Sequence, residues 1–331
     1  MKSHALARLL LVLLLLVAAA PAAADKPRIV ATMLPIHSLV AGLAGDAYET
    51  ELLLPADASP HGYAMRPSEA RRLQDADVVV WVGPELETFL ERPLRRAGER
   101  QIISLADDLD LDLLPTRAGG VWERHRHGHG HGDHGHDNDH GHDHGHDHYD
   151  NHLWLSPAIA RAITEQLADE LAARDPQRAD MIRANRDAQL ERIAALDAEL
   201  AAQLEPVRDE AFIVFHDAYQ YFEHHFGLNA AGSISLDPSR MPGPRRLAEL
   251  RQRAAEGDVV CLFTEPQFRP ALAETVAEGT GVRLGMLDPI GAELEPGPDA
   301  WFQLLEDLAD GFLDCLAADT EHAEAHQGNA D

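Results

Sequence analysis

The stretch that decides the fold runs from Ala211 to Ile234 and reads AFIVFHDAYQYFEHHFGLNAAGSI. Its first five residues are apolar, which predicts a buried strand over Ala211–Phe215. A helix is expected over Ala218–Phe226, and a further strand over Leu228–Ile234. A strand, a helix and a strand in this order are typical of a parallel sheet covered by helices.

The same alternation recurs on both sides of this stretch. Further apolar runs that predict strands lie at 28–33, 51–54, 77–82, 101–105, 258–264 and 282–287. Helices are expected to begin at Pro35, Ser68 and Glu85 and to cover 158–171, 244–255, 270–278 and 301–316. The sequence therefore predicts an α/β fold of two (βα)4-type lobes with mainly parallel sheets.

A single long helix is predicted between the two lobes, from Pro176 to about Glu205, because its Ala, Leu, Arg, Glu and Gln residues favour helix. Roughly 28 residues at about 1.5 Å each span about 42 Å. We expect this helix to join the lobes as a rigid strut. The predicted boundaries are a signal peptide (1–24), an N-terminal lobe (25–175), the linking helix (176–205), a C-terminal lobe (206–316) and a disordered tail (317–331).

The N-terminus has the pattern of an export signal. Lys2 and Arg8 precede an apolar run over Leu9–Ala20, which is too short to span a membrane. Small residues at 22–24 predict cleavage before Asp25. The mature chain is therefore expected to be exported to a periplasm, without direct membrane insertion, and to act as a monomer.

Acidic residues outnumber basic ones in this chain. Lys and Arg total 28, Asp and Glu total 56, and the net charge is −28. Removing a signal peptide with two basic residues gives 26 − 56 = −30. Such a charge argues against nucleic acids and anionic membranes as partners. The two cysteines, Cys261 and Cys315, are most simply a disulfide in an oxidising compartment; a thiolate metal site is the alternative.

A histidine-rich segment over 124–148 interrupts the first lobe. It lacks apolar residues and is rich in Gly and Asp, so we expect it to be disordered. Imidazole suits Zn, Cu, Ni and Co, and a flexible chain that presents many imidazoles should bind metals loosely and unselectively. The histidines of this auxiliary metal loop are His125, His127, His129, His131, His134, His136, His140, His142, His144, His146 and His148.

Three other histidines lie in loops near the ends of predicted strands, where ligands bind in parallel α/β sheets. They are His61, His152 and His216, and Asp288 follows the last predicted strand. Three imidazoles and one carboxylate suit a tetrahedral zinc site. A single histidine in a loop is more often a surface or capping residue than a metal ligand, so the prediction depends on the joint placement of these residues and on the adjacent histidine-rich segment.

Two acidic residues beside these positions are candidates for orienting an imidazole. Asp217 follows His216 directly, and Glu265 lies at another strand end. A helix N-terminal acid is an equally good account of Asp217. Three histidines with an open position would also suit a zinc hydrolase. However, the chain has neither an HExxH motif nor a Gly-x-Ser-x-Gly nucleophile elbow, and Glu265 is the only obvious base.

Five motifs carry a family resemblance across nearly the whole mature chain. They are SPHGYAMRPS at 59–68, DNHLWLSP at 150–157, FHDAYQYF at 215–222, TEPQF at 264–268 and LDPIG at 287–291. In this order they resemble the periplasmic zinc-binding proteins of high-affinity zinc ABC importers, the ZnuA type of the cluster A-I metal solute-binding family. The His/Asp-rich insert before the second ligand motif is also a mark of the zinc branch.

The resemblance implies two lobes joined by one long helix, with Zn²⁺ bound as transported cargo in the interlobe cleft. It implies His61, His152 and His216 as ligands. Pro60 stands where some members have a glutamate ligand, which leaves Asp288, a water or a loop histidine for the fourth position. Histidine rather than a carboxylate at 216 favours zinc over manganese. The Cys261–Cys315 pair matches a disulfide in similar proteins.

The implied function is capture of zinc and delivery to an inner-membrane ABC permease with its ATPase, by a binding protein that is not an enzyme. The alternatives are a periplasmic zinc buffer or chaperone without a permease, a manganese-binding relative, and the hydrolase considered above.

Overall fold

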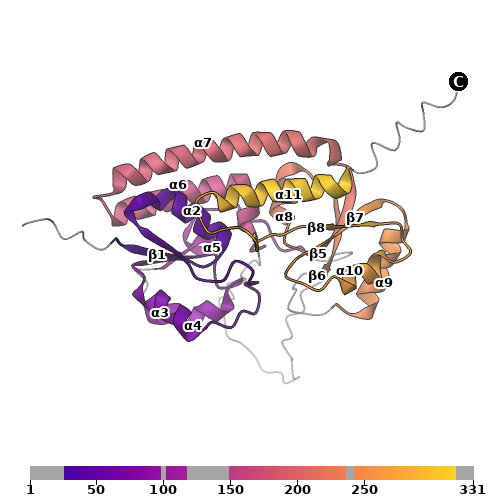
Figure 1. Ribbon diagram of the computed structural model, residues 1–331, viewed down its shortest axis with the longest axis horizontal. Helices are drawn as coiled ribbons and strands as arrows, with labels where there is room; N and C mark the ends of the chain where they lie inside the picture. The colour runs from indigo at the N-terminus through magenta and orange to yellow at the C-terminus, as the bar shows by residue number, and fades with distance from the viewer. Residues whose placement is uncertain (1–25, 98–101, 118–148, 236–241, 318–331) are drawn as a thin grey trace, which may run out of the picture.

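The computed structural model describes residues 26–97, 102–117, 149–235 and 242–317. The predicted signal peptide, the histidine-rich segment and nearly all of the predicted tail lie outside these ranges. The described chain forms two lobes that lie side by side beneath one long helix (Figure 1). The predicted α/β fold with two parallel-sheet lobes is confirmed.

The first lobe is built on a four-stranded parallel sheet in the order β2-β1-β3-β4. Its strands are β1 (Arg28–Ala31), β2 (Glu49–Leu52), β3 (Val78–Trp81) and β4 (Ile102–Ser104). Its α-helices are α2 (Leu34–Ala44), α3 (Pro67–Asp75), α4 (Glu91–Ala97), α5 (Leu105–Asp108) and α6 (Pro157–Arg174). Short 3-10 turns are η1 (Gly45–Ala47), η2 (Thr88–Leu90) and η4 (Leu153–Leu155).

The second lobe repeats this arrangement. Its sheet is also parallel, and its order β6-β5-β7-β8 corresponds strand for strand to that of the first. The strands are β5 (Ala211–His216), β6 (Ala230–Ser235), β7 (Val259–Thr264) and β8 (Arg283–Met286). The helices are α8 (Gln220–Phe226), α9 (Pro244–Ala255), α10 (Ala271–Ala277) and α11 (Ala300–Leu316), with the 3-10 turn η5 (Glu205–Val207) before the first strand.

Alternation along the strands assigns side chains to two faces of each sheet. In the first lobe Val30 and Val79 pack with Leu73 of α3, whereas Ile29 and Val80 face the opposite side. In the second lobe Ile213 packs toward α9 and α10 in the same way. The opposite faces of both sheets contribute to one continuous hydrophobic core that extends across the two lobes.

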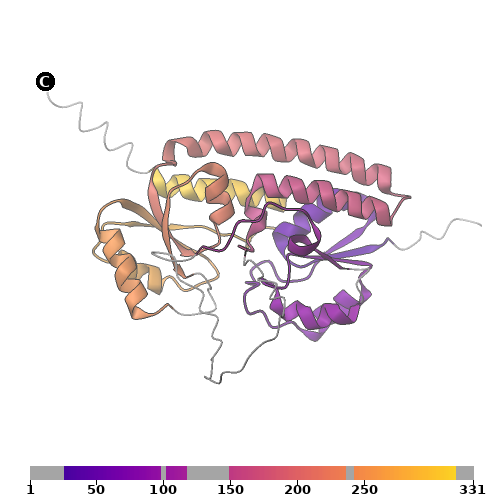
Figure 2. The same cartoon turned by 180° about the vertical axis from the view of Figure 1, so that it is seen from behind.

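The long helix α7 (Ala179–Leu204) runs over both lobes, as the two opposite views show (Figures 1 and 2). It packs along α6 and α2 of the first lobe and against α11 and α8 of the second. Its 26 residues span about 39 Å at about 1.5 Å per residue. The predicted long helix is confirmed; the lobe boundaries at 175 and 206 stay predictions.

Direct contacts between the lobes add to this connection. Trp301 at the start of α11 donates its indole N–H to the carbonyl of Trp154 (2.8 Å). Its backbone N–H donates to the hydroxyl of Ser38 in α2 (2.9 Å). The indole of Trp154 in turn donates to the carbonyl of Pro289 (2.7 Å). Since both indoles are fully buried, these hydrogen bonds fix how the lobes meet.

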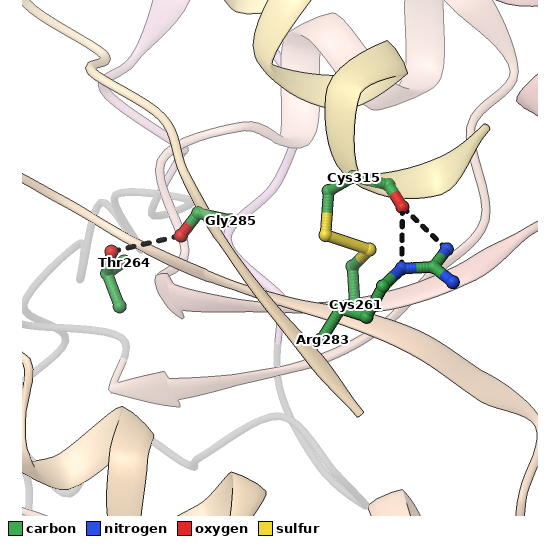
Figure 3. Close-up of a disulfide and its surroundings, with 5 residues drawn as sticks. All are labelled: Cys261, Thr264, Arg283, Gly285 and Cys315. Carbon is green, nitrogen blue, oxygen red and sulfur yellow. Dashed lines mark hydrogen bonds between the residues drawn. A yellow bond between two sulfur atoms is a disulfide. The ribbon is translucent and has the colours of Figure 1, made fainter. Parts of the chain in front are cut away.

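The disulfide between Cys261 and Cys315 is present and joins β7 to α11 (Figure 3). The guanidinium of Arg283, on the neighbouring strand β8, donates two hydrogen bonds to the carbonyl of Cys315. On the same strand pair, the hydroxyl of Thr264 donates to the carbonyl of Gly285 (3.0 Å). The C-terminal end of α11 is therefore held to the sheet covalently and by hydrogen bonds.

Several predicted element bounds differ from those in the structure, and two examples follow. The second strand ends at Leu52 rather than Leu54. The helix expected from Glu85 begins only at Glu91, because the carboxylate of Glu87 turns back to accept hydrogen bonds from the backbone N–H groups of Val82 and Gly83. No helix in the described ranges is long and apolar enough to cross a membrane.

Candidate metal centre

Three imidazoles from distant parts of the sequence converge between the lobes. The Nε2 atom of His152 lies 3.3 Å from that of His61 and 3.2 Å from that of His216. Among the described residues, these three form the single cluster of His, Cys, Asp or Glu side chains whose ligand atoms all lie within 4.8 Å of one another. The structure thus brings together the three histidines that the sequence singled out.

His152 is fixed by an acidic residue two positions before it. One carboxylate oxygen of Asp150 accepts hydrogen bonds from both the backbone N–H (3.0 Å) and Nδ1 (2.7 Å) of His152. The backbone bond is an Asx turn, which holds the chain, and the ring bond holds the imidazole. The ring also packs edge-on against Trp154, at a centroid distance of 5.4 Å.

The residues directly before and after the histidine-rich segment pair with each other next to this turn. An antiparallel bridge pairs Pro115 with Tyr149, and the backbone N–H of Asp150 donates to the carbonyl of Leu114 (2.8 Å). The hydroxyl of Tyr221 in α8 donates to the carbonyl of Asp150 (2.9 Å) and accepts from the N–H of Leu114 (3.0 Å). The second lobe therefore helps to position Asp150 and, through it, His152.

His216 is the last residue of β5, at the carboxyl edge of the second sheet. Its Nδ1 lies 2.8 Å from each carboxylate oxygen of Glu265, which follows β7, the strand next to β5. Both residues are almost fully buried. The parallel register of the two strands explains why residues 49 positions apart meet.

His61 is held more loosely than the other two. It lies on the loop between β2 and α3 and keeps partial solvent exposure. Its backbone N–H donates to the hydroxyl of Ser59 (3.3 Å). Burial of the ring, together with the neighbouring rings of His152 and His216, lowers the pKa of His61 well below its ordinary value. This ring is therefore neutral at pH 7, as a metal ligand must be.

The hydrogen bonds to carboxylates decide which nitrogen of each ring carries the proton. Because a carboxylate accepts, the Nδ1 atoms of His152 and His216 donate, and their Nε2 atoms carry lone pairs. Two lone pairs 3.2 Å apart repel each other unless a cation lies between them. In a tetrahedral site, Zn–N bonds of about 2.0–2.1 Å place the nitrogens about 3.3–3.4 Å apart. The observed spacing matches this geometry.

The cavity beside these nitrogens is small. Its volume of about 10 Å³ is about the room that one water-sized guest needs. The three histidines, Trp154, Gln267 and Phe268 line it with residues of both lobes. This space suits a single ion rather than an organic molecule.

Asp288 and Asp217, two further residues of the predicted site, have other partners than the three imidazoles. The carboxylate of Asp288 accepts hydrogen bonds from Gln267 Nε2 (2.7 Å) and from three backbone N–H groups of the loop after it. It does not belong to the three-histidine cluster. The carboxylate of Asp217 forms an ion pair with Arg117 (3.5 Å) instead of holding an imidazole.

Asp150 and Gln267 are site residues that the sequence reasoning missed. The Asp-x-His spacing at 150–152 was a usable signal for Asp150, because an aspartate accepts readily from the backbone two residues on. No comparable signal exists for Gln267, whose side-chain direction depends on the fold. The eleven histidines of the auxiliary loop lie outside the described residues.

Comparison with known proteins places the chain in a family. Residues 29–315 match the family model described as ZnuA, zinc-uptake complex component A, periplasmic. The chain belongs to the ZnuA family. A protein named high-affinity zinc uptake system protein ZnuA from Brucella suis is 40% identical over 311 residues, covering 89% of this chain and 93% of the relative. A protein of the same name from Yersinia pestis is 37% identical over 295 residues, covering 87% and 91%.

Solved structures share the fold. A crystal structure of ZnuA superposes with a TM-score of 0.71 at 24% identity and covers 88% of this chain and 100% of that one. The binding protein FpvC from Pseudomonas aeruginosa, in complex with Mn²⁺, gives a TM-score of 0.72 at 24% identity and covers 89% and 99%. These likenesses show that the two-lobed fold is shared with these structures.

Proposed function

We propose that this protein captures Zn²⁺ in the periplasm with His61, His152 and His216 and delivers it to an inner-membrane ABC permease and its ATPase. The observation that carries the proposal is a cluster of three imidazoles in which Nε2 of His152 lies 3.3 Å from that of His61 and 3.2 Å from that of His216, close to tetrahedral zinc spacing. The names of the relatives, high-affinity zinc uptake system proteins, support the same cargo. The family's periplasmic description supports export, and we assign export to a signal peptide at 1–24.

Binding rather than catalysis is the function that the cavity supports. A guest space of about 10 Å³ fits a single ion. Glu265, the single base candidate from the sequence, is engaged with the Nδ1 of His216 through both of its oxygens. It therefore orients a ligand instead of activating a water.

Release is expected to begin at His61. His152 and His216 are buried and held by carboxylates, whereas His61 lies on a partly exposed loop. The lobes share one core and are joined by α7 and by the contact between Trp154 and Trp301, so wide opening would expose apolar surface. Movement of the His61 loop frees one ligand without that cost.

Zinc-limited growth tests the function as a whole. A strain lacking the protein is supplied with the wild-type chain, His216→Ala or His225→Ala. His225 is a matched control, because it pairs with Asp197 on α7, away from the three-histidine cluster. We expect wild type and His225→Ala to restore growth and His216→Ala to fail. Equal growth of all four strains, including the strain that receives no copy of the protein, would indicate a zinc buffer without a permease. Steady ester or peptide turnover that His216→Ala abolishes would indicate a hydrolase.

A further inference from the structure

Gln267 lines the cavity of the three imidazoles and carries a buried acceptor that has no hydrogen-bond partner. Gln267 follows Glu265 in the turn after β7 and lines the same small cavity as the histidines. Its Oε1 atom is buried and has no hydrogen-bond partner among the described residues. A buried carbonyl oxygen without a donor is unfavourable, so this position calls for a donor that enters with the guest.

The direction of the amide is fixed by its other end. The Nε2 atom of Gln267 donates to Oδ1 of Asp288 (2.7 Å). The same Oδ1 accepts from the backbone N–H groups of Ile290 and Gly291 (3.1 Å each), and Oδ2 accepts from that of Ala292 (2.5 Å). Because a carboxylate only accepts, the amide nitrogen must face Asp288 and the amide oxygen must point away from it.

The Nε2 atoms of His152 and His216 do not supply the missing donor. The Nε2 atoms of His152 and His216 carry lone pairs, because their Nδ1 atoms donate to Asp150 and Glu265. Three nitrogen ligands leave one position of a tetrahedral zinc ion for a water. A water bound to Zn²⁺ is strongly polarised and is a good donor.

We propose, on the basis of the zinc binding proposed above, that Gln267 Oε1 accepts a hydrogen bond from a water at the fourth position of the bound Zn²⁺. Asp288 then contributes as the residue that orients Gln267, not as a ligand. A neutral amide adds no charge to the site, and a water leaves more readily than a carboxylate ligand. This arrangement completes the coordination while keeping the fourth ligand exchangeable, which suits a cargo that must be released.

The test is a competitive Zn²⁺ titration of the full chain with Gln267→Leu, Gln220→Leu and His152→Ala, with thermal unfolding of each metal-free protein. Gln220 is the matched control, since its Oε1 is likewise buried without a partner but does not line the cavity. Loss of a partner behind a metal site typically costs about 10–100-fold in affinity. We expect Gln267→Leu to weaken zinc binding by about 10-fold or more, with unfolding temperature unchanged and Gln220→Leu within about twofold of wild type.

The outcomes separate this proposal from the proposed function. Zinc binding as tight in Gln267→Leu as in wild type, with loss in His152→Ala, would overturn the role of Gln267 and leave the three-histidine site intact. Equal weakening by Gln267→Leu and Gln220→Leu would also overturn it. Tight binding that survives His152→Ala would instead remove the proposed function. As a second readout, the visible absorption of the Co²⁺-loaded protein should change in Gln267→Leu and not in Gln220→Leu; identical spectra would contradict a contact with the fourth ligand.

An Asp288→Ala variant distinguishes the orienting role from direct ligation. If Asp288 acts through Gln267, Asp288→Ala should weaken zinc binding to a similar extent. The double variant should then bind zinc with about the affinity of whichever single variant binds it more weakly. A large loss in Asp288→Ala with none in Gln267→Leu would assign the fourth position to Asp288 and refute the proposal.

Discussion

Replacing Glu265 by glutamine tests how the protein prepares His216 for the metal. Both carboxylate oxygens of Glu265 lie 2.8 Å from Nδ1 of His216, and both residues are buried. A carboxylate can only accept, which keeps the proton on Nδ1 and the lone pair on Nε2. Glutamine has the same shape but also offers a donor. When its amide N–H faces the ring, Nδ1 must accept, and the proton moves to the Nε2 that should bind zinc.

The size of the effect follows from the bond that is lost. A hydrogen bond to a charged group contributes about 1.5–3 kcal/mol. Loss of a partner behind a metal-bound imidazole typically costs about 10–100-fold in affinity. At about 1.4 kcal/mol per tenfold change, the second range corresponds to about 1.4–2.8 kcal/mol. The two ranges agree, so we expect the zinc dissociation constant of Glu265→Gln to rise by about 10–100-fold.

The assay is chelator competition for Zn²⁺ at constant pH, with Asp217→Asn as the control. Asp217 is adjacent to His216 but pairs with Arg117, and burial raises the pKa of its carboxyl well above the ordinary value. Asparagine has the same shape as aspartate, so this variant should bind zinc within about twofold of wild type, because no imidazole contact is changed. Unchanged affinity in Glu265→Gln, or equal losses in both variants, would refute the reasoning about the tautomer.

Two further predictions concern stability of the metal-free protein. Burial raises the pKa of Glu87 to about 7, so the folded protein holds a proton that the unfolded chain loses near pH 4.5, and this group lowers stability as pH rises between those values. From pH 5 to pH 8, the free energy of unfolding of Glu87→Gln should therefore increase by about 2.5 kcal/mol relative to that of wild type. Chemical unfolding at the two pH values measures this, and a difference independent of pH would contradict it. The double substitution Cys261→Ser and Cys315→Ser should lower the free energy of unfolding by about 2–4 kcal/mol while leaving zinc affinity unchanged. Loss of zinc affinity would indicate that the disulfide positions the site.

The fold was largely predictable because several strands are continuous apolar runs. The stretch at 78–82 is buried on both faces, which is typical of a strand inside a parallel sheet. The boundaries were less accurate where a side chain redirects the backbone, as Glu87 does after β3. Such contacts involve only a few atoms, and residue type alone does not reveal them.

The ligand positions were predictable for a related reason. Parallel strands bring their carboxyl ends to one edge, so histidines that follow strands were expected to meet there. The partners of those histidines were harder to infer. Asp217 was a plausible partner of His216 by sequence, yet it pairs with Arg117, a hundred residues earlier. Asp288 follows a strand as a ligand would, but its oxygens are used by its own loop and by Gln267.

The most direct test of the account is the stoichiometry and affinity of Zn²⁺ binding by a chain that lacks residues 124–148, compared with the same chain carrying His152→Ala. We expect the shortened chain to keep one site that binds Zn²⁺ tightly and His152→Ala to abolish that site. Loss of the tight site on removal of the histidine-rich segment, or its survival in His152→Ala, would contradict the claim that three converging imidazoles hold the cargo.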